Sequence, residues 1–371
     1  MTNSATHLSS DKSMTLLSRL LLSHRYDDNS SLSKTADIRY EVENLTREEF
    51  DDVLGLACSN HVVIRGINVF LGMMREVGDE VRIEWAESAL SLERSRINTA
   101  LSFLHSVCNA FEDEKHDVAV IKSLDHYPDL GSDLDLYTDA NPHEVSRLMA
   151  RRFHAEVAQP SWGDRLAHKA NFIIPGLPEA VEVHMGRLGQ TGEQVVIASH
   201  LLKRTRIAQI SDYAFRVLSA SDRLMISTLQ RMYRHFYFRL CDIVDSAALI
   251  ESGEVDFDGL QSLASMAGIW EGVATYLLIV SDYVERFKGS SIYLPQNVRS
   301  AARFGGDKVY YGHGFLRVPI MPQSVKLYGS QLANLLRKHE LQSGARLSLL
   351  PWLATAAAIG KKITGSDKGV W

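Results

Sequence analysis

The chain of 371 residues is long enough for two or three domains and a sizeable core. Acidic residues outnumber basic ones by 45 to 40, which argues against a generic nucleic-acid binder, so nucleic acid stays an open but unfavoured partner. No stretch is apolar for long enough to span a bilayer, and we expect no stable membrane insertion. Three scattered cysteines without metal-ligand spacing, and no recognisable signal peptide, lead us to expect a cytoplasmic protein.

The first part of the chain predicts a helical region. Thr46 and Glu49 form the pattern of a capping box, and apolar residues follow them at helical spacing. A much longer periodic segment over 83–112 predicts one long helix packed on the core. The expected elements are, in order, a short amphipathic helix over 14–24, a polar loop over 27–35, and helices over 46–57, 61–74 and 83–112.

Residues 118–138 organise the rest of the chain, because they predict two short strands joined by a polar loop. Alternation along the second strand places Asp133 and Asp135 on one face, about 7 Å apart, and turns Leu134 and Leu136 to the core. Two neighbouring carboxylates repel each other unless a cation lies between them. Hard oxygen ligands of this kind suit Mg²⁺ or Mn²⁺ and serve phosphoryl or nucleotidyl transfer.

Taken alone, the acidic pair also fits a solvated turn or a helix N-cap. Its surroundings favour the strand, because an apolar strand over 118–121 ends at Lys122 and Ser123, and nine residues separate Ser123 from Asp133. The pattern resembles the signature of the polymerase β-like nucleotidyltransferase superfamily: a strand, a small residue at a phosphate-binding turn, a spacer, then alternating acidic and hydrophobic residues. Ser123 takes the second small position of that turn, and Lys122 stands where the family usually has Gly. A second alignment, with residues 131–132 as the small pair, leaves no spacer before the acids.

The superfamily needs a third acid on a neighbouring strand, and the sequence offers Glu182. Residues 168–174 and 180–185 predict two strands joined by a turn over 175–178, with Glu182 and His184 on one face. Glu182 also fits a solvent-facing residue of a half-exposed hairpin. His184 fits a residue that supports the metal or the nucleotide, and equally a polar residue at a sheet edge.

From residue 199 onward strand signals nearly vanish, which predicts a helical C-terminal region. A strong helix is expected over 221–241. Arg231, His235 and Arg239 follow one another at spacings of four and would share a face of that helix. Such a face suits a triphosphate, and it equally suits a solvated surface.

The apolar stretch over 347–359 predicts a buried C-terminal helix, with a helix lying on a membrane as the alternative. The whole layout resembles the bacterial "uncharacterised nucleotidyltransferase" branch of the superfamily, and the resemblance covers the larger part of the chain. It rests on the early helices, the K-S…D-L-D-L motif, the V-E-V-H strand and the helix from Arg231 to Asp242. It implies an α+β fold with a small mixed sheet in a catalytic core over 115–200, a helical region over 1–114 and a helical domain over 201–371.

The resemblance also implies a function. It is that of a metal-dependent nucleotidyltransferase that transfers a nucleoside monophosphate from a nucleoside triphosphate, such as ATP, to an unidentified small-molecule or macromolecular acceptor. Two alternatives are an inactive nucleotide-binding or interaction module and a toxin-like enzyme that modifies tRNA or protein. The implied site comprises Asp133, Asp135 and Glu182 as catalytic residues that bind Mg²⁺ (or Mn²⁺), and Lys122, Ser123, Arg231 and His235 as nucleotide-binding residues.

Overall fold

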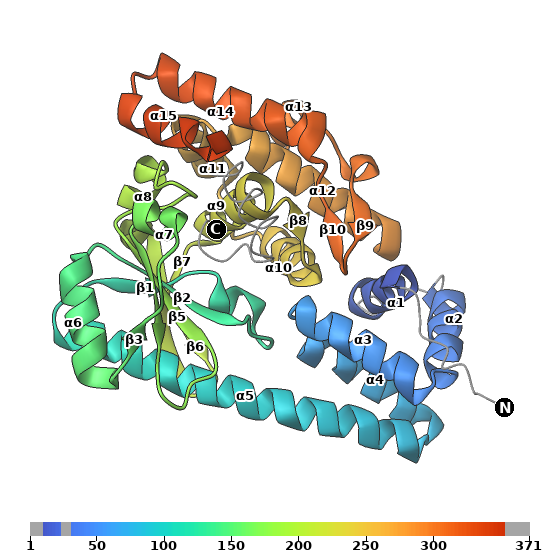
Figure 1. Cartoon of the computed structure of the whole chain (residues 1–371). Coiled ribbons are helices and arrows are strands. Elements are labelled where there is room, and N and C mark those ends of the chain that lie inside the picture. The colour runs from blue at the N-terminus through green and yellow to red at the C-terminus, as the bar shows by residue number, and fades with distance from the viewer. Residues whose placement is uncertain (1–9, 24–30, 353–371) are drawn as a thin grey trace.

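The computed structural model describes residues 10–23 and 31–352. Helices surround a seven-stranded mixed sheet, and a separate three-stranded sheet lies among the C-terminal helices (Figure 1). The predicted α+β fold with helical flanks is confirmed. Within the described ranges, no helix is long and apolar enough to cross a membrane. The helix expected over 347–359 lies mostly outside them.

The N-terminal region is helical, as predicted. Thr46 caps its third helix with the expected capping box, in which the Glu49 amide donates to Thr46 Oγ1 (3.2 Å) and the Thr46 amide to Glu49 Oε2 (2.9 Å). A helix beginning at Ser31 corrects the loop expected over 27–35. The helices are α1 (Ser10–Leu22), α2 (Ser31–Glu43), α3 (Arg47–Ser59), α4 (Val63–Val77) and α5 (Glu80–Asp113).

Helix α5 connects the N-terminal helices to the large sheet. It spans 34 residues, lies below the N-terminal helices and the large sheet in Figure 1, and ends just before the first strand. Its buried positions repeat at helical spacing and include Ile97, Leu101 and Leu104, and it packs on β1 (Val118–Val120) and β7 (Tyr213–Leu218). The long helix therefore places the loop after β1 at a fixed position relative to the N-terminal helices.

The seven-stranded sheet has the order β3-β4-β5-β2-β1-β7-β6. The central strand β2 pairs in parallel with β5 and antiparallel with β1, which pairs in parallel with β7. The remaining strands of this sheet are β2 (Asp133–Thr138), β3 (Glu156–Val157), β4 (Lys169–Ile173), β5 (Ala180–Met185) and β6 (Thr205–Ile210). The helices among these strands are α6 (Pro142–Phe153), α7 (Trp162–Ala167) and α8 (Val195–Leu201).

Strands β6 and β7 correct the expectation that strand signals nearly vanish after residue 199. They form a hairpin whose two-residue turn holds Ser211 at a positive φ of 51°. Strand β6 is half-exposed at the edge of the sheet, and Arg206 among its residues gave it a polar appearance. The sheet therefore continues beyond residue 200, where the catalytic core was expected to end.

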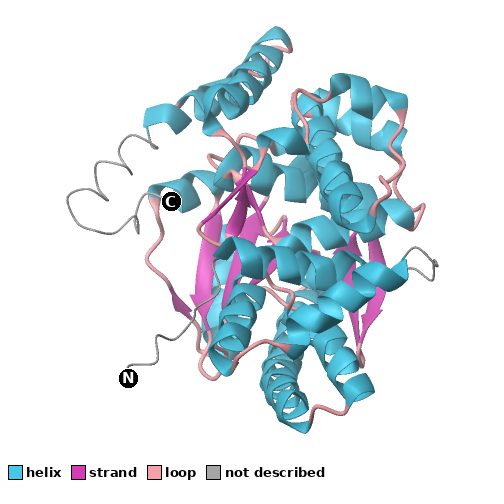
Figure 2. Ribbon diagram, turned by 90° about the vertical axis from the view of Figure 1, so that its right-hand side faces the viewer, coloured by secondary structure: helices cyan, strands magenta, loops and turns pink. Residues whose placement is uncertain are grey.

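The C-terminal region is mainly helical. Its three-stranded sheet, in the order β8-β10-β9, stands apart from the larger sheet in Figure 2. The elements are α9 (Ala220–Gln230), β8 (Tyr237–Phe238), α10 (Leu240–Glu251), α11 (Phe257–Met266), α12 (Trp270–Lys288), α13 (Gln296–Ala301), β9 (Tyr310–Gly312), β10 (Phe315–Arg317), α14 (Val325–Arg337) and α15 (Leu341–Ser348).

Candidate active site

Two central strands bring the three predicted acids together. Strands β2 and β5 run parallel with Asp135 directly opposite Glu182, so Asp133, Asp135 and Glu182 share one face of the sheet. The alternate residues point to the other face and are fully buried: Leu134, Leu136, Val181 and Val183. All three acids line one cavity, which spans about 620 Å³ including its opening to solvent. Their catalytic roles stay predictions, but their convergence is a feature of the fold.

We call this space the polar cavity, because charged and polar side chains make most of its wall. Four cationic residues stand beside the three acids. Besides the acids, the wall includes His61, Lys122, Ser123, His126, Gln230, Arg231, Arg234, His235, Tyr237 and Arg239. All seven residues that the sequence analysis assigned to the site are therefore in or at this one cavity.

Lys122 reaches the acids from a strained turn. Its φ of 65° and ψ of −58°, with the Ser123 amide donating to the Ile121 carbonyl (2.8 Å), make it the middle residue of a γ-turn. Glycine adopts a positive φ without cost, whereas lysine does not, so the turn stores strain of about 1–3 kcal/mol. The turn brings Lys122 Nζ to 2.5 Å from Asp135 Oδ1 and 3.6 Å from Glu182 Oε1. The ammonium group thus neutralises the two facing carboxylates.

Ser123 has a structural contact where the sequence analysis assigned it to the phosphates. Its hydroxyl donates to the Asp133 carbonyl (3.1 Å) and accepts from the Asp135 amide (2.7 Å). The side chain is buried, at 2% exposure. Ser123 therefore fastens the γ-turn to β2, and both hydrogen bonds of its hydroxyl are made within the protein.

Glu182 lies among three nitrogen groups. Lys169 Nζ is 2.9 Å from its Oε2 and also 2.9 Å from Asp164, and His184 Nε2 is 2.8 Å from its Oε1. Burial alone would raise the pKa of Glu182, but Lys122, His184 and Lys169 together hold it well below the usual range. Burial lowers the pKa of His184 to about 4, so the imidazole is neutral. Glu182 is consequently ionised near neutral pH.

The two acids of β2 differ from Glu182. Burial, opposed by Lys122 and reinforced by the charge of Glu182, raises the pKa of Asp135 to about 7. Burial also raises the pKa of Asp133, whose carboxylate has no hydrogen bond or ion pair to any described residue. A cation bound beside Asp133 and Asp135 would favour their ionised forms and so lower the pKa of each carboxyl group.

Arg231, His235 and Arg239 line the polar cavity, but they do not lie on one continuous helix. Helix α9 ends at Gln230, a π-helical turn covers Arg231–His235, and Phe236 takes a positive φ of 55°. The helix expected over 221–241 is therefore wrong in its second half, and Arg239 instead caps the next helix, α10. The bend turns these side chains toward the cavity from a short loop.

Arg231 is a structural residue, in contrast to its neighbours. It is 1% exposed, its Nε lies 2.7 Å from Asp242 Oδ2, and its guanidinium stacks on Tyr237. Arg234 and Arg239 are half-buried in the same cavity and have no ion pair with any described residue. The guanidinium groups of Arg234 and Arg239, in contrast to that of Arg231, are therefore available to an anionic ligand in the polar cavity. Sequence spacing included Arg239 in the basic face but gave no reason to choose Arg234.

The donor set fits a divalent cation. Asp133 and Asp135 offer oxygens from one strand and Glu182 from the next, which is the ligand chemistry that Mg²⁺ and Mn²⁺ prefer. His184 also lies within ligand distance of Asp135 and Glu182. An ion held by these acids would compete with Lys122 for Asp135 and Glu182.

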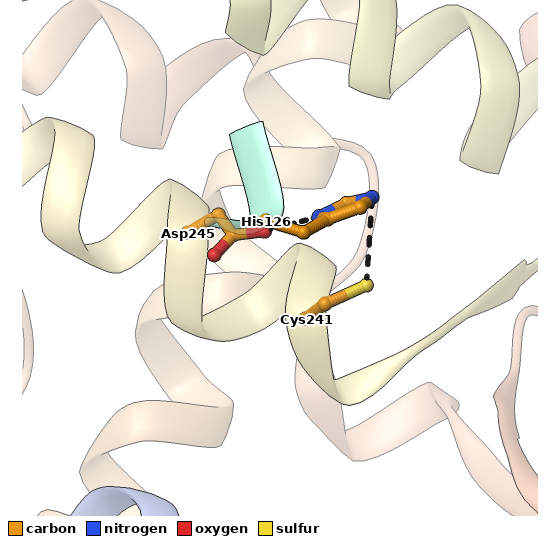
Figure 3. A group of neighbouring side chains, drawn as sticks. All are labelled: His126, Cys241 and Asp245. Carbon is orange, nitrogen blue, oxygen red and sulfur yellow. Dashed lines mark hydrogen bonds and ion pairs between the residues drawn. The ribbon is translucent and has the colours of Figure 1, made fainter. Parts of the chain in front are cut away.

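A buried network of hydrogen bonds and ion pairs joins the loop between β1 and β2 to α4 and α10, and Figure 3 shows part of it. His126 Nδ1 is 2.5 Å from Asp245 Oδ2, and His126 Nε2 is 3.8 Å from Cys241 Sγ. Arg65 bridges Asp245 (2.5 Å) and Asp129 (2.7 Å). Both oxygens of Asp245 are engaged, so we interpret the group as a structural link among α4, α10 and this loop. The sequence gave no signal for it, because its members are up to 180 residues apart.

Two comparisons with known proteins gave no match. No protein-family model matches it. No curated protein matches it either. The resemblance to polymerase β-like nucleotidyltransferases therefore stays a prediction, and the geometry of the polar cavity is the main guide to function.

Proposed function

We propose that the chain is a metal-dependent nucleotidyltransferase, which moves a nucleoside monophosphate from a nucleoside triphosphate to an acceptor hydroxyl. The observation that carries this proposal is the convergence of Asp133, Asp135 and Glu182 in a cavity that also contains Arg234 and Arg239. The carboxylates suit Mg²⁺ or Mn²⁺, and the guanidinium groups suit phosphate oxygens. One cavity thus matches both parts of a metal–triphosphate complex.

The reaction assigns a distinct task to each group. Asp133, Asp135 and Glu182 hold the ion, which when bound supplies positive charge to the reacting phosphate. Arg234 and Arg239 bind and orient the phosphate chain. The acceptor oxygen forms a bond to the α-phosphorus while the bond to the bridging oxygen breaks, pyrophosphate leaves, and the acceptor proton passes to solvent.

Lys122 would have different partners in the site without an ion and in the site with one. Its ammonium group neutralises Asp135 and Glu182 in the absence of an ion. Two cations cannot both satisfy the same carboxylate oxygens, so ion binding frees Lys122 for a phosphate oxygen. A flexible lysine suits this exchange better than an arginine, because it makes a point contact and not a bidentate one.

Calorimetric titration with ATP, GTP, CTP and UTP, with Mg²⁺ and with EDTA, tests the proposal. Wild type should bind at least one of them only with Mg²⁺, and Asp133→Asn/Asp135→Asn should lose that binding. The matched control Asp51→Asn/Asp258→Asn removes two exposed carboxylates and should bind like wild type. Binding that needs no metal, or no binding in wild type, would instead support an inactive module in which Lys122 is the permanent counter-ion.

A further inference from the structure

A second cavity adjoins the polar cavity. It spans about 480 Å³ including its opening to solvent, and it shares Lys122, Gln230 and Arg234 with the polar cavity. We call it the apolar cavity after the residues that distinguish it from its neighbour: Ile121, Leu188, Ile226, Leu229 and Tyr233. The hydroxyl of Tyr233 lies against Gly272, so the phenol group is occupied elsewhere. Gln190 and Glu193 also line the cavity, together with His184 and the three shared residues, so about half of the lining residues carry polar side chains.

His184 places a nitrogen, unpartnered within the described part of the chain, at the wall of the apolar cavity. Its ring lines the cavity and is 6% exposed, and its Nε2 is bound to Glu182 Oε1 (2.8 Å). An ionised carboxylate only accepts hydrogen bonds, so Nε2 carries the proton and Nδ1 is left as an acceptor. Nδ1 is buried and has no hydrogen-bond partner among the described residues. A buried polar atom of this kind is costly unless a ligand or a water molecule satisfies it.

We propose, on the basis of the proposed function, that the apolar cavity binds the acceptor substrate. The acceptor is a compact, largely apolar molecule with one hydroxyl or amino group, which donates a hydrogen bond to His184 Nδ1. The apolar and aromatic side chains of the wall would pack against the carbon skeleton of such a molecule.

The position of the two cavities supports this assignment. In a phosphoryl or nucleotidyl transfer the attacking and leaving oxygens lie roughly in line on opposite sides of the phosphorus. The polar cavity takes the phosphates, and the apolar cavity meets it at Lys122, whose ammonium group touches Asp135. His184 lies two residues after Glu182 on the same face of β5. A hydroxyl held by His184 would therefore be beside the three acids.

Two chemical probes test the proposal. 2-Naphthol has an apolar ring system and a hydroxyl, and 2-methoxynaphthalene has the same ring system but cannot donate. Calorimetry should show that wild type binds 2-naphthol about five- to tenfold more tightly than the ether, which corresponds to one satisfied hydrogen bond. Leu229→Trp fills the apolar cavity and should abolish binding of both, whereas Leu92→Trp, at a position 73% exposed, should bind both like wild type.

A second variant keeps the test valid if Leu229→Trp does not fold. His184→Phe removes Nδ1 and should abolish the preference for 2-naphthol over the ether. Failure of 2-naphthol to bind wild type, equal affinity for the two probes, or unchanged binding by folded Leu229→Trp would each overturn the proposal. Binding of Mg²⁺ and ATP to the same wild-type sample is measured in parallel. If the nucleotide binds and 2-naphthol does not, only the acceptor assignment fails, whereas loss of nucleotide binding would count against the proposed function.

Discussion

Lys122 and Asp135 form a close, buried ion pair at the centre of the polar cavity, with Lys122 Nζ 2.5 Å from Asp135 Oδ1. Both side chains are about one-tenth exposed, and the lysine reaches its partner from a γ-turn with a positive φ. The pair places a cation where three carboxylates converge. If the chain is a metal-dependent nucleotidyltransferase, the Lys122 ammonium group stands in for the metal ion until the substrate complex arrives.

Replacing Lys122 by Met should destabilise the protein and make it dependent on metal. The change leaves Asp135 and Glu182 facing each other without their shared cation, which should lower the free energy of unfolding by about 3–5 kcal/mol. Urea unfolding with and without Mg²⁺ measures the effect, and Mg²⁺ should restore stability more in the variant than in wild type. Lys308→Met breaks a pair that is more than half exposed and should change stability by less than about 1 kcal/mol. A loss that Mg²⁺ does not reduce would contradict a metal site at these acids.

Replacing Arg231 should mainly lower the stability of the protein, whereas replacing Arg234 should mainly weaken nucleotide binding. Arg231→Met leaves the buried Asp242 without its partner and should cost about 3–5 kcal/mol of stability. Arg234→Met removes a half-buried side chain with no described ion pair, so the protein should fold normally and bind nucleotide about tenfold or more weakly. Thermal unfolding and calorimetry on both variants check this. Normal nucleotide affinity in folded Arg234→Met would show that Arg234 does not contact the phosphates.

The network behind the loop should contribute strongly to stability. Asp245→Asn weakens the pairing to both Arg65 and His126, and we expect a loss of about 3–5 kcal/mol in the free energy of unfolding. Asp51→Asn breaks an exposed pair with Arg47 and should cost less than about 1 kcal/mol. Urea unfolding of the two variants gives the comparison. Similar small losses would mean that the Asp245 network does not hold the loop.

His61 should make the protein sensitive to acid. Burial, with the nearby Arg239 charge, lowers its pKa to about 2 in the folded state, against about 6.5 in an unfolded chain. A lowered folded pKa gives stability that is present above pH 6.5 and is lost as the pH falls toward 2. Each pH unit in that window should cost about 1.4 kcal/mol from this one group.

The His61→Gln variant tests that slope. Its unfolding free energy should fall less steeply than that of wild type between pH 6.5 and 4.5, as measured by urea unfolding across the range. His143→Gln, at an exposed position, should follow the wild-type curve. Parallel curves for wild type and His61→Gln would show that His61 becomes protonated without penalty.

Sequence reasoning found the acids because strand alternation is a strong local signal. Asp133 and Asp135 alternate with two leucines that become fully buried, and Glu182 lies between two buried valines. The alternation of acidic and apolar residues along a strand determines which face of the sheet each side chain points to. The pairing of Asp135 with Glu182 follows once β2 and β5 become neighbours.

The sequence carries only a weak signal for β6 and β7. The segments over 205–210 and 213–218 flank a two-residue Ser–Asp turn, but neither segment alternates strictly between apolar and polar residues, and the turn lacks the glycine that marks most two-residue hairpins. Basic residues near the start of the first segment obscured this signal. A half-exposed edge strand is polar on much of its surface, so composition alone does not distinguish it from a loop.

Other features of the site depend on contacts between distant residues. Nothing local predicts the bend at Phe236, since residues 231–241 have an unbroken helical pattern; the Arg231–Asp242 pair spans the bend. Arg65 meets Asp245 from 180 residues away. The γ-turn at Lys122 is likewise invisible in sequence, because lysine seldom takes a positive φ.

A metal site at the three acids is best tested by a crystal structure with Mn²⁺ and the α,β-methylene analogue of the nucleotide selected by calorimetry. Anomalous scattering locates manganese without ambiguity. We predict a peak bound by Asp133, Asp135 and Glu182, with Lys122 Nζ moved from Asp135 to a phosphate oxygen. A structure in which the analogue is bound, no manganese peak lies at these acids and Lys122 keeps its 2.5 Å contact with Asp135 would contradict the proposed metal-dependent function.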